Sequence, residues 1–323
     1  MLIKKLYYWY CFGGLNYVYL KIKDKIMHDR KAKDKLYEIL SHVDTTEYRK
    51  MIELIYAAKT GHKFKLDKPR TFNEKIQWLK LYDATELKTQ LADKYLVREW
   101  IKSKIGKEYL IPLIGVWDSV EEIDIEKLPT KFCIKATHGC GWNIIVKNKN
   151  DIEWETVKEK LNYWLTLNYA FVNGLELQYL NIPHKIMVEE YIENDKGKLF
   201  DYKIHCFSGE PTYIQVIGDR DLNRHTAREV FYDTNWKKQI FTDGVFHEKM
   251  EMEKPVVLES MLRLAKVLSK EFAYARVDLY VLNENKIKFG EMTFTPASGF
   301  AKWNPTSANE RLGKLIKLPK CNV

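Results

Sequence analysis

The first third of the chain carries apolar residues at three- and four-residue spacing, the pattern of amphipathic helices. This spacing predicts helices from residue 29 to residue 100, with an apolar face formed by Leu36, Ile39, Leu40, Val43, Tyr48, Met51, Ile52 and Ile55. Pro69 interrupts the pattern before Thr71 and Glu74, whose spacing is that of a capping box and predicts a helix through Leu81. A further helix is expected over Leu91–Ile105, ending near Gly106.

From residue 109 onward the pattern changes to short apolar runs bounded by turn residues, which predict strands. The expected strands are 109–113, 114–117, 132–136, 143–146, 185–192, 201–207, 212–217, 230–233, 275–282 and 286–293. Helices are expected over 154–167 and after Pro255 through Leu268. With 323 residues, the chain is long enough for two or three compact lobes.

The N-terminal segment is aromatic and basic, with an apolar run from Leu6 to Leu20. The run is too short to span a bilayer and is interrupted by Gly13, Gly14 and Asn16. One interpretation is a helix or hairpin that packs on the main body or on a partner. The other is peripheral membrane association, with anionic headgroups facing Lys4, Lys5, Lys21, Lys23 and Lys25. The first is favoured because the segment is not cleanly amphipathic.

The charge and cysteine content narrow the class of protein. There are 53 Lys and Arg against 44 Asp and Glu, a net charge of +9, which suits anionic partners. No helix-turn-helix, RNA-recognition or zinc-finger signature is present, so nucleic acid is not expected as a partner. The five cysteines are widely spaced without a C-x-x-C pair, which argues against a disulfide framework and a zinc site. A cytoplasmic protein is expected.

The stretch from residue 273 to residue 296 carries the densest candidate chemistry. Its two predicted strands flank an Asn-Glu-Asn turn at residues 283–285, which favours a hairpin. Because side chains alternate along a strand, Arg276 and Asp278 share one face, and Glu291 and Thr293 share another. If the strands pair, Asp278 and Glu291 face one another and need a cation between them. Such a pair is typical of a Mg²⁺ site completed by phosphate and water, but a solvated hairpin with scattered charges has the same pattern.

Two other segments suit anion binding. Residues 137–142 form a glycine-containing loop between two predicted strands, where main-chain N–H groups could approach phosphate oxygens, with Lys135 at its base. This is not a P-loop, because G-K-[ST] and the following helix are absent. Residues 218–229 are expected to form a loop rich in guanidinium groups that could hold a carboxylate or phosphate: Arg220, Arg224 and Arg228.

These features occur in an order that resembles the ATP-grasp superfamily. The most specific part is R-x-D followed by E-x-T thirteen residues after the Asp, then Pro296 and Gly299. Longer segments are similar to the teichuronopeptide-type (TupA-like) ATP-grasp family of surface-polysaccharide loci: TFNEKIQWLKLYD, LADKYLVREWIKSKIG, YLIPLIGVWDSVEEID, LPTKFCIKATHGCGWN, DYKIHCFSGEP and FGEMTFTPASGF. The resemblance covers residues 71–305 and implies an α+β ATP-grasp fold, in which two α+β lobes clamp ATP, with a helical N-terminal region.

The resemblance also implies a role for each matching residue. Lysines 94 and 135 would bind the ATP phosphates, the Gly loop would fold over them, and residues 189–192 would hold adenine and ribose. The implied nucleotide-binding set is Lys94, Lys135, His138, Gly139, Gly141, Glu189, Glu190, Tyr191, Ile192 and, as a looser match, Lys237. The implied Mg²⁺ ligands are Asp278, Glu291 and Thr293, the last standing where many members have Asn. Arg276 and Lys135 would be catalytic.

The implied activity is ATP-dependent ligation of a carboxylate to an amine through an acyl phosphate. The family context suggests a uronic-acid carboxylate of a surface polysaccharide or its precursor as acceptor, and an amino acid or amine as the second substrate. Three alternatives stay open: a glycosyltransferase of the same pathway, an ATP-dependent sugar kinase that stops after phosphoryl transfer, and a non-catalytic scaffold at a membrane. The site would lie in the cytoplasm, with the inner face of the membrane as a second possibility.

The same comparison divides the chain into four parts. Residues 1–45 would be a basic and aromatic N-terminal segment, and 46–129 a helical region ahead of the ATP-grasp lobes. Residues 130–195 would form the N-lobe with the Gly loop, and 196–323 the C-lobe with the metal site.

Overall fold

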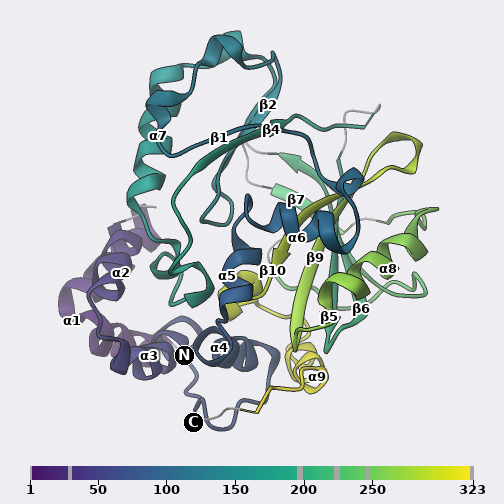
Figure 1. Cartoon of the computed structure of the whole chain (residues 1–323). Helices are drawn as coiled ribbons and strands as arrows, with labels where there is room; N and C mark the ends of the chain where they lie inside the picture. The colour runs from purple at the N-terminus through teal and green to yellow at the C-terminus, as the bar shows by residue number, and fades with distance from the viewer. Residues whose placement is uncertain are drawn as a thin grey trace.

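The computed structural model describes residues 2–27, 31–194, 199–221, 226–244, 248–249 and 251–320. Figure 1 shows the chain. Its helices are α1 (Leu2–Met27), α2 (Lys31–Ser41), α3 (Tyr48–Thr60), α4 (Phe72–Tyr82), α5 (Glu86–Ala92), α6 (Val97–Lys104), α7 (Trp154–Thr166), α8 (Leu258–Ser269) and α9 (Ser307–Leu315). Its strands are β1 (Leu113–Trp117), β2 (Phe132–Ala136), β3 (Asn143–Val146), β4 (Ile186–Glu190), β5 (Asp201–Phe207), β6 (Glu210–Asp221), β7 (Thr226–Asp233), β8 (Glu248–Lys249), β9 (Tyr274–Val281) and β10 (Ile287–Thr293).

Within the described residues, the smaller sheet has four antiparallel strands in the order β1-β4-β2-β3. Helix α7 covers one face, where Leu161 and Trp164 join a core with Ile134 and Val188. The opposite face carries Lys135 of β2 and Glu189 of β4, because neighbouring residues of a strand point to opposite sides. β1 precedes the predicted boundary at residue 129 and yet pairs with β4, so this sheet begins ahead of residue 130.

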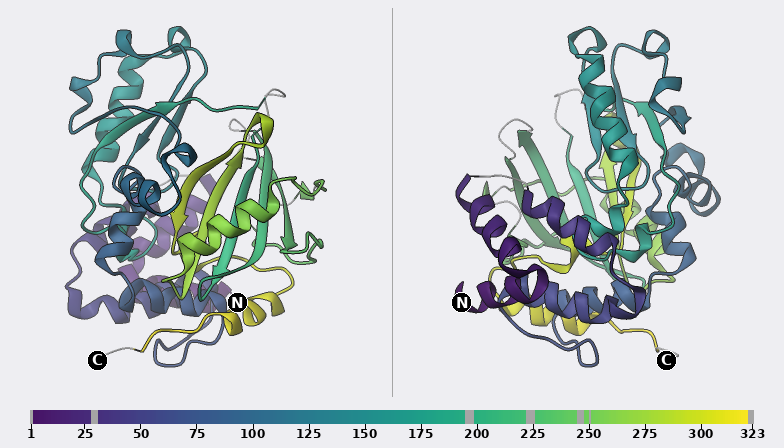
Figure 2. Two further views of the ribbon diagram at one scale, coloured as in Figure 1. Left: turned by 45° about the vertical axis from the view of Figure 1, so that its right-hand side comes forward. Right: turned by 90° about the vertical axis from the view of Figure 1, so that its left-hand side faces the viewer.

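The larger sheet has the order β10-β9-β5-β6-β7-β8 in the part of the chain that is described, and α8 lies across its outer face (Figure 2, left). Side chains along β9 point alternately to the apolar core and to a polar face of the sheet. Ala275, Val277 and Leu279 pack into the core shared with α8, whereas Arg276 and Asp278 point the other way. The same alternation on neighbouring strands extends that polar face with Lys203, His205 and Gln215.

A bulge decides which residues of β10 reach the polar face. Phe289 pairs with Leu279, but the next pair is Glu291 with Asp278, so Gly290 is the extra residue. A Cβ on Gly290 would lie 3.0 Å from the Asp278 carbonyl oxygen and from the Tyr280 ring, which explains the glycine. After the bulge the alternation is reversed, and Glu291 and Thr293 face the same side as Asp278.

The N-terminal helices pack together on the opposite side of the molecule from α8 (Figure 1). α1 is broken at Gly13 and Gly14, where Gly14 has φ 68°. Its residues Tyr8, Phe12 and Tyr17 are buried, and the helix contacts α2 and α3. Helix α4 begins at the predicted capping box of Thr71 and Glu74 and packs on α9 from the other end of the chain.

Most predicted elements are present, and three differ. The strand expected over 109–113 is absent from these described residues, because Tyr109 ends a 3-10 helix (Lys107–Tyr109) and only Leu113 belongs to β1. The helix expected over Leu91–Ile105 is two helices separated by a turn, in which the Asp93 carboxylate accepts hydrogen bonds from the backbone N–H groups of Tyr95 (2.7 Å) and Leu96 (3.1 Å). The loop expected at residues 218–229 is largely strand, since β6 runs to Asp221 and β7 starts at Thr226. Residues 222–225, which include Arg224, lie outside the described residues.

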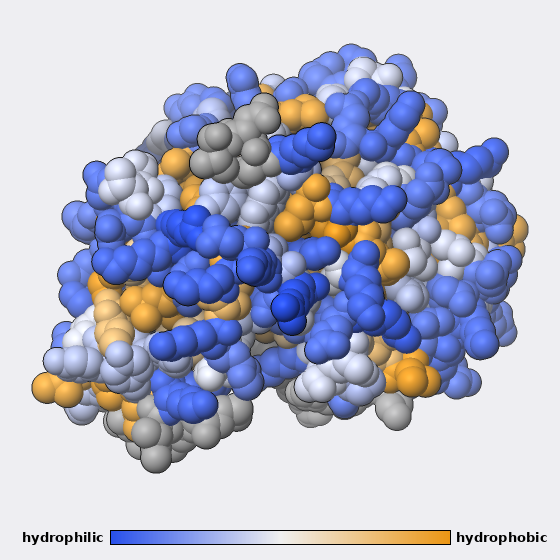
Figure 3. Space-filling model, turned by 90° about the horizontal axis from the view of Figure 1, so that it is seen from below, coloured by the Kyte–Doolittle hydropathy of each residue, from blue (hydrophilic) through white to orange (hydrophobic). Residues whose placement is uncertain are grey.

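The underside of the molecule is predominantly hydrophilic, with hydrophobic residues in small separate patches (Figure 3). In the described part of the chain, none of the helices is long and apolar enough to cross a membrane. The predicted peripheral association of the N-terminal segment stays a prediction.

Candidate active site

A cavity of about 690 Å³ is lined by the polar faces of both sheets and by the start of α6. Its charged lining comes from five separate segments of the chain: Lys94 and Arg98; Lys135 and Lys147; Glu189; Asp201 and Lys203; and Asp278 and Glu291. Apolar side chains line another part of its wall: Val97, Leu110, Ile145, Tyr191, Ile192, Leu199 and Phe289. A cavity with an apolar part and converging charged groups has the composition of a small-molecule site.

The two predicted metal carboxylates face each other across β9 and β10, as their pairing requires. The Arg276 guanidinium lies behind them. It donates to both Asp278 oxygens at 2.7 Å, a bidentate pair, and also to the Glu291 carboxylate at 3.1 Å. The cation needed between these carboxylates is therefore supplied in part by Arg276.

The two carboxylates differ in how many cations hold them. Lys203, which the sequence analysis missed, donates to Asp278 at 2.7 Å from the neighbouring strand β5. Burial alone would raise the pKa of Asp278, but Arg276 and Lys203 hold it well below its usual range. Asp278 is thus a buried anion fixed by two cations, whereas the Glu291 side chain is 29% exposed and faces the cavity.

Thr293 and Arg276 lie behind the carboxylates rather than on the cavity wall. The Thr293 hydroxyl accepts from Arg276 at 3.0 Å and donates to Glu291 at 3.1 Å. Both residues are about nine-tenths buried. Arg276 and Thr293 therefore contact the two carboxylates directly and do not line the cavity. The predicted roles of Arg276 at the phosphoryl group and of Thr293 as a metal ligand stay predictions.

On the opposite side of the cavity, Lys135 of β2 contacts Glu189 of β4 at 2.5 Å. Burial alone would lower the pKa of Lys135, but the Glu189 carboxylate raises it, so the ammonium stays charged. Arg98 of α6 donates to the other Glu189 oxygen at 2.6 Å and to the Ile111 carbonyl oxygen at 2.8 Å. Arg98 was missed by the sequence analysis because its role depends on how α6 packs against β4.

Lys94 lies in the turn between α5 and α6 and holds the glycine loop. Its backbone N–H donates to the Thr137 carbonyl oxygen at 3.1 Å, and its ammonium contacts the Gly139 carbonyl oxygen. Burial lowers the pKa of Lys94, although nearby Glu291 opposes the shift. Gly141 has φ 72° and lines the cavity, so a left-handed turn brings the loop backbone to this wall.

His138 and Lys237 lie away from the cavity. The buried His138 ring stacks on His184 (centroids 4.0 Å apart), and its Nε2 lies 3.0 Å from the Trp164 carbonyl oxygen. Burial lowers the pKa of His138 to about 4. Only the backbone of His138 can therefore belong to a phosphate-binding loop. Lys237 is an exposed residue in the turn after β7 and does not line the cavity.

Of the remaining predicted residues, some line the cavity and others do not. Tyr191 and Ile192 line the apolar wall, whereas Glu190 is exposed and its backbone N–H donates to the Pro112 carbonyl oxygen. Arg228 lies on β7 and is half-buried, outside the cavity lining. Arg220 lies on β6, but its side chain is outside the described residues, as is all of Arg224.

The residues present fit ATP with magnesium. Mg²⁺ is commonly held by one or two carboxylates together with substrate phosphates, and Asp278 and Glu291 supply such a pair. Among the described residues there is no cluster of three or more His, Cys, Asp or Glu that would form a metal cage of its own. Lys94, Lys135, Lys147 and Lys203 line the same cavity and match the charge of a triphosphate.

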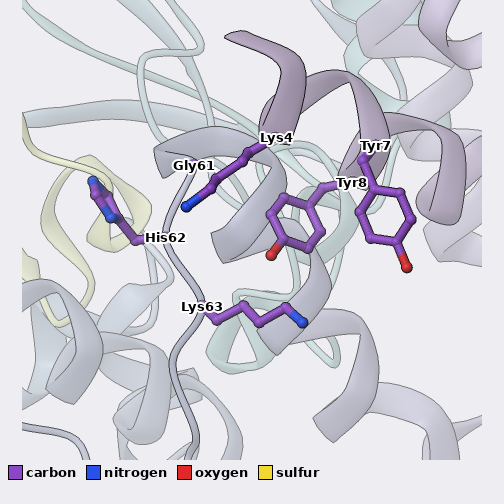
Figure 4. Close-up of a pocket in the computed structure, with 6 residues that line it drawn as sticks. All are labelled: Lys4, Tyr7, Tyr8, Gly61, His62 and Lys63. Carbon is purple, nitrogen blue, oxygen red and sulfur yellow. The ribbon is translucent and has the colours of Figure 1, made fainter. Parts of the chain in front are cut away.

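A second hollow, of about 480 Å³, lies where α1 meets the segment after α3. Lys4 and Tyr8 of α1 line it across from His62 and Lys63 (Figure 4). The Lys63 ammonium lies 5.9 Å from the centroid of the Tyr8 ring. Its lining contains no carboxylate, and therefore it lacks the metal-binding groups that the cavity between the sheets provides.

Solved structures to which this chain is similar include two D-alanine–D-alanine ligases. The enzyme from Bacillus anthracis, complexed with ATP, is 16% identical, with 63% of this chain and 55% of that chain covered and a TM-score of 0.37. The enzyme from Helicobacter pylori is 17% identical, with 77% and 69% covered and a TM-score of 0.41. The chain thus spans little more than half the length of the first.

The sequence has no match among curated proteins. A family model described as TupA-like ATPgrasp matches residues 74–317, which include both sheets and every charged residue of the cavity wall. The match covers most of the chain and spans the paired carboxylates, the lysines opposite them and the glycine loop. This protein therefore belongs to the TupA-like ATP-grasp family and has the α+β ATP-grasp fold.

Proposed function

We propose that the protein is an ATP-dependent carboxylate–amine ligase that forms an acyl phosphate. The observation that carries the proposal is the composition of one cavity: Asp278 and Glu291 on one wall and Lys94 and Lys135 on the other. Bound ATP and Mg²⁺ would supply the phosphoryl group and neutralise its charge, held by those residues. The apolar wall with Tyr191 and Ile192 would take the adenine.

The chain's own groups would then act on the acceptor carboxylate. Attack of a carboxylate on the γ-phosphate brings several negative charges together, which positioned cations stabilise. Lys203 lines the cavity beside Asp278 and, with Lys94, is placed to do this. Arg276 would hold the Asp278 carboxylate in position through two hydrogen bonds, so that Asp278 and Glu291 can bind the same metal ion. The loop at 137–142 would exclude water from the acyl phosphate.

We further propose a uronic-acid carboxylate of a surface polysaccharide or its precursor as the acceptor, and an amino acid or amino sugar as the amine. The support for this is the family, together with the basic net charge of +9. Arg228, with Arg220 and Arg224, remains a candidate for recognising the acceptor. The amine would attack the acyl phosphate, displacing phosphate and forming an amide.

The test is ADP release by the purified protein with Mg²⁺, assayed across uronic acids with and without amines. A ligase should require the carboxylate acceptor, respond to the amine, and convert hydroxylamine into a hydroxamate by trapping the acyl phosphate. A stable phosphorylated sugar without hydroxamate would identify a kinase instead. Transfer of sugar from a nucleotide-sugar with no ATP consumed would identify a glycosyltransferase, and the absence of both activities with intact partner binding would favour a scaffold.

A further inference from the structure

A separate cavity of about 350 Å³ lies among the N-terminal helices, outside the site just described. It is bounded by α1, α2, α3 and two loop segments, and the N-terminal helices that form it face the viewer in Figure 2, right. We call it the lysine cavity, after the five lysines in its lining: Lys5, Lys21, Lys33, Lys59 and Lys302. Its volume lies within the range of small-molecule sites.

The charged side chains in the described lining of the lysine cavity are all positive. No Asp or Glu is among its described lining residues, although the five lysines come from four separate segments. Within the described part of the chain, Lys33, Lys59 and Lys302 form no ion pair. Converging like charges repel one another, so this arrangement is favourable when an anion lies between them.

The ammonium group of Lys59 is fixed in position by contacts with a backbone carbonyl group and an aromatic ring. Its ammonium donates to the Asn173 carbonyl oxygen at 2.7 Å and lies 4.2 Å from the centroid of the Phe300 ring. Loss of hydration there lowers the pKa of Lys59 to about 8; Glu176 opposes the shift, whereas Lys21 and Lys33 add to it. These contacts fix the ammonium at the cavity wall and leave it able to bind an anion.

Apart from Asn173, the rest of the lining is apolar, and four of these residues are aromatic. Trp9, Phe12 and Tyr17 of α1 lie in the lining together with Phe300. The Trp9 indole donates to the Ala58 carbonyl oxygen at 3.0 Å, which fixes its orientation. Aromatic rings bury the apolar C–H face of a pyranose, and lysines bind carboxylates as point charges. A ligand that satisfies both has a ring with an apolar face and negative groups at its edge.

We propose that the lysine cavity binds a carboxylated saccharide, the anionic glycan part of the acceptor. The identification with the acceptor rests on the proposed function, whereas the binding does not. The cavity is also linked to the active site through the chain, since Phe300 and Lys302 follow the short segment that leaves β10 through the 3-10 helix Pro296–Gly299. In this connection Thr295 donates to Glu176 at 3.3 Å, and Ser298 accepts from the buried Lys80 at 2.7 Å.

The test measures binding without turnover. The intact protein would be titrated with hexagalacturonate by calorimetry, in the absence of ATP, with neutral maltohexaose and inorganic pyrophosphate as comparison ligands. The double variant Lys33→Gln/Lys302→Gln removes two exposed charges from the cavity rim. The matched control is Lys270→Gln/Lys314→Gln, which removes two exposed charges elsewhere.

The wild type should bind hexagalacturonate with an affinity that falls as salt rises, and should not bind maltohexaose. The rim variant should lose about tenfold or more in affinity, and the control less than about twofold. Equal affinity in both variants would overturn the proposal, and so would equal binding of maltohexaose. Binding of pyrophosphate alone would replace it with a phosphate site.

The outcome is independent of the ligase assay. If the protein makes no hydroxamate and still binds hexagalacturonate through the cavity lysines, the proposed function is wrong and the binding site stands. If hydroxamate forms with a monomeric uronic acid and the rim variant binds hexagalacturonate as the wild type does, the ligase stands and the lysine cavity does not bind the glycan.

Discussion

The Asp278–Glu291 pair shows that two carboxylates in one site can be held quite differently. Asp278 is buried and contacts both Arg276 and Lys203 at 2.7 Å, whereas the Glu291 side chain is 29% exposed. Removing one partner of a buried ion pair leaves the other charge uncompensated, at a typical cost of about 3–5 kcal/mol. Asp278→Asn would therefore change stability and activity together. Glu291 is the better residue for testing the metal site.

We expect Glu291→Gln to abolish Mg²⁺-dependent ADP release, because it removes one of two negative charges available to the metal. Its urea unfolding midpoint should change little, since the side chain is partly exposed. ADP release and unfolding would be measured on the same preparation. Glu259→Gln, an equal change at an exposed residue of α8, is the control and should keep full activity. Near-wild-type ADP release by Glu291→Gln would contradict the two-carboxylate site.

A second acidic residue should make stability depend on pH. Burial raises the pKa of Glu229 from 4.5 to about 8, and the negative charge of the nearby Asp243 adds to the shift. Its Oε2 accepts from Gln215 at 3.0 Å, and its Oε1 has no hydrogen-bond partner among the described residues. Between these values the folded protein binds more protons than the unfolded chain, so stability should fall as pH rises from about 4.5 to about 8.

Glu229→Gln keeps the shape of the side chain and removes this titration. We expect the variant to be more stable than the wild type at pH 8 and to show a flatter profile, the difference growing by at most about 1.4 kcal/mol per pH unit. Urea unfolding at half-unit intervals would measure it, with Glu190→Gln as control. A wild-type profile that does not fall above pH 5, or one unchanged in Glu229→Gln, would show that Glu229 titrates normally.

Among the elements, the contact of α9 with α4 depends on one glycine. A Cβ at Gly313 would lie 2.4 Å from the Arg70 carbonyl oxygen and 2.7 Å from the Phe72 nitrogen. These backbone atoms belong to the start of α4, where Thr71 and Glu74 form the capping box. A side chain there cannot be accommodated by rotating a neighbour, so the two helices would have to separate.

We therefore expect Gly313→Ala to destabilise the protein by about 1–3 kcal/mol, although alanine favours a helix more than glycine does. Denaturant unfolding would show a lower midpoint. Lys314→Ala, an exposed position of the same helix, controls for helix propensity and should leave the midpoint within error. A stabilised Gly313→Ala variant would mean that α9 does not pack this closely on α4.

At the scale of the whole molecule, the proposed ATP site uses both sheets, so nucleotide should stabilise them together. A ligand that binds only the folded state adds about 2.7 kcal/mol at one hundred times its Kd. We expect ATP with Mg²⁺ to raise the unfolding free energy in this way and to slow hydrogen exchange in residues 137–142.

Lys135→Ala should weaken ATP binding by about 1.5–3 kcal/mol through loss of a charge-assisted contact. At the same ATP concentration this should remove roughly half or more of the gain in unfolding free energy. Each protein would be compared with and without nucleotide, so that the loss of the Lys135–Glu189 pair cancels. Lys270→Ala, at an exposed position, should keep the full gain. An undiminished gain in Lys135→Ala would leave Lys135 as a partner of Glu189 only.

The sequence by itself determined the features that depend on neighbouring residues. Alternation along a strand placed Arg276 and Asp278 on one face, and the Thr71–Glu74 spacing located the start of α4. These patterns are local, because the period of a strand or the cap of a helix is set within a few residues. The segments that match the family are equally readable from the chain, and the family match confirms them.

Only the tertiary structure decided which distant groups share the site. Lys203 and Arg98 join it because β5 lies beside β9 and α6 packs against β4, and His138 leaves it because its ring stacks in the core. The lysine cavity likewise exists only where α1, α2 and α3 meet the segment after β10. The bulge at Gly290 depends on both levels. The glycine can be read from the sequence, but the change in side-chain alternation after it is seen only in how β10 pairs with β9. Long-range contacts follow from how whole faces bury against one another, and no short window of sequence contains that information.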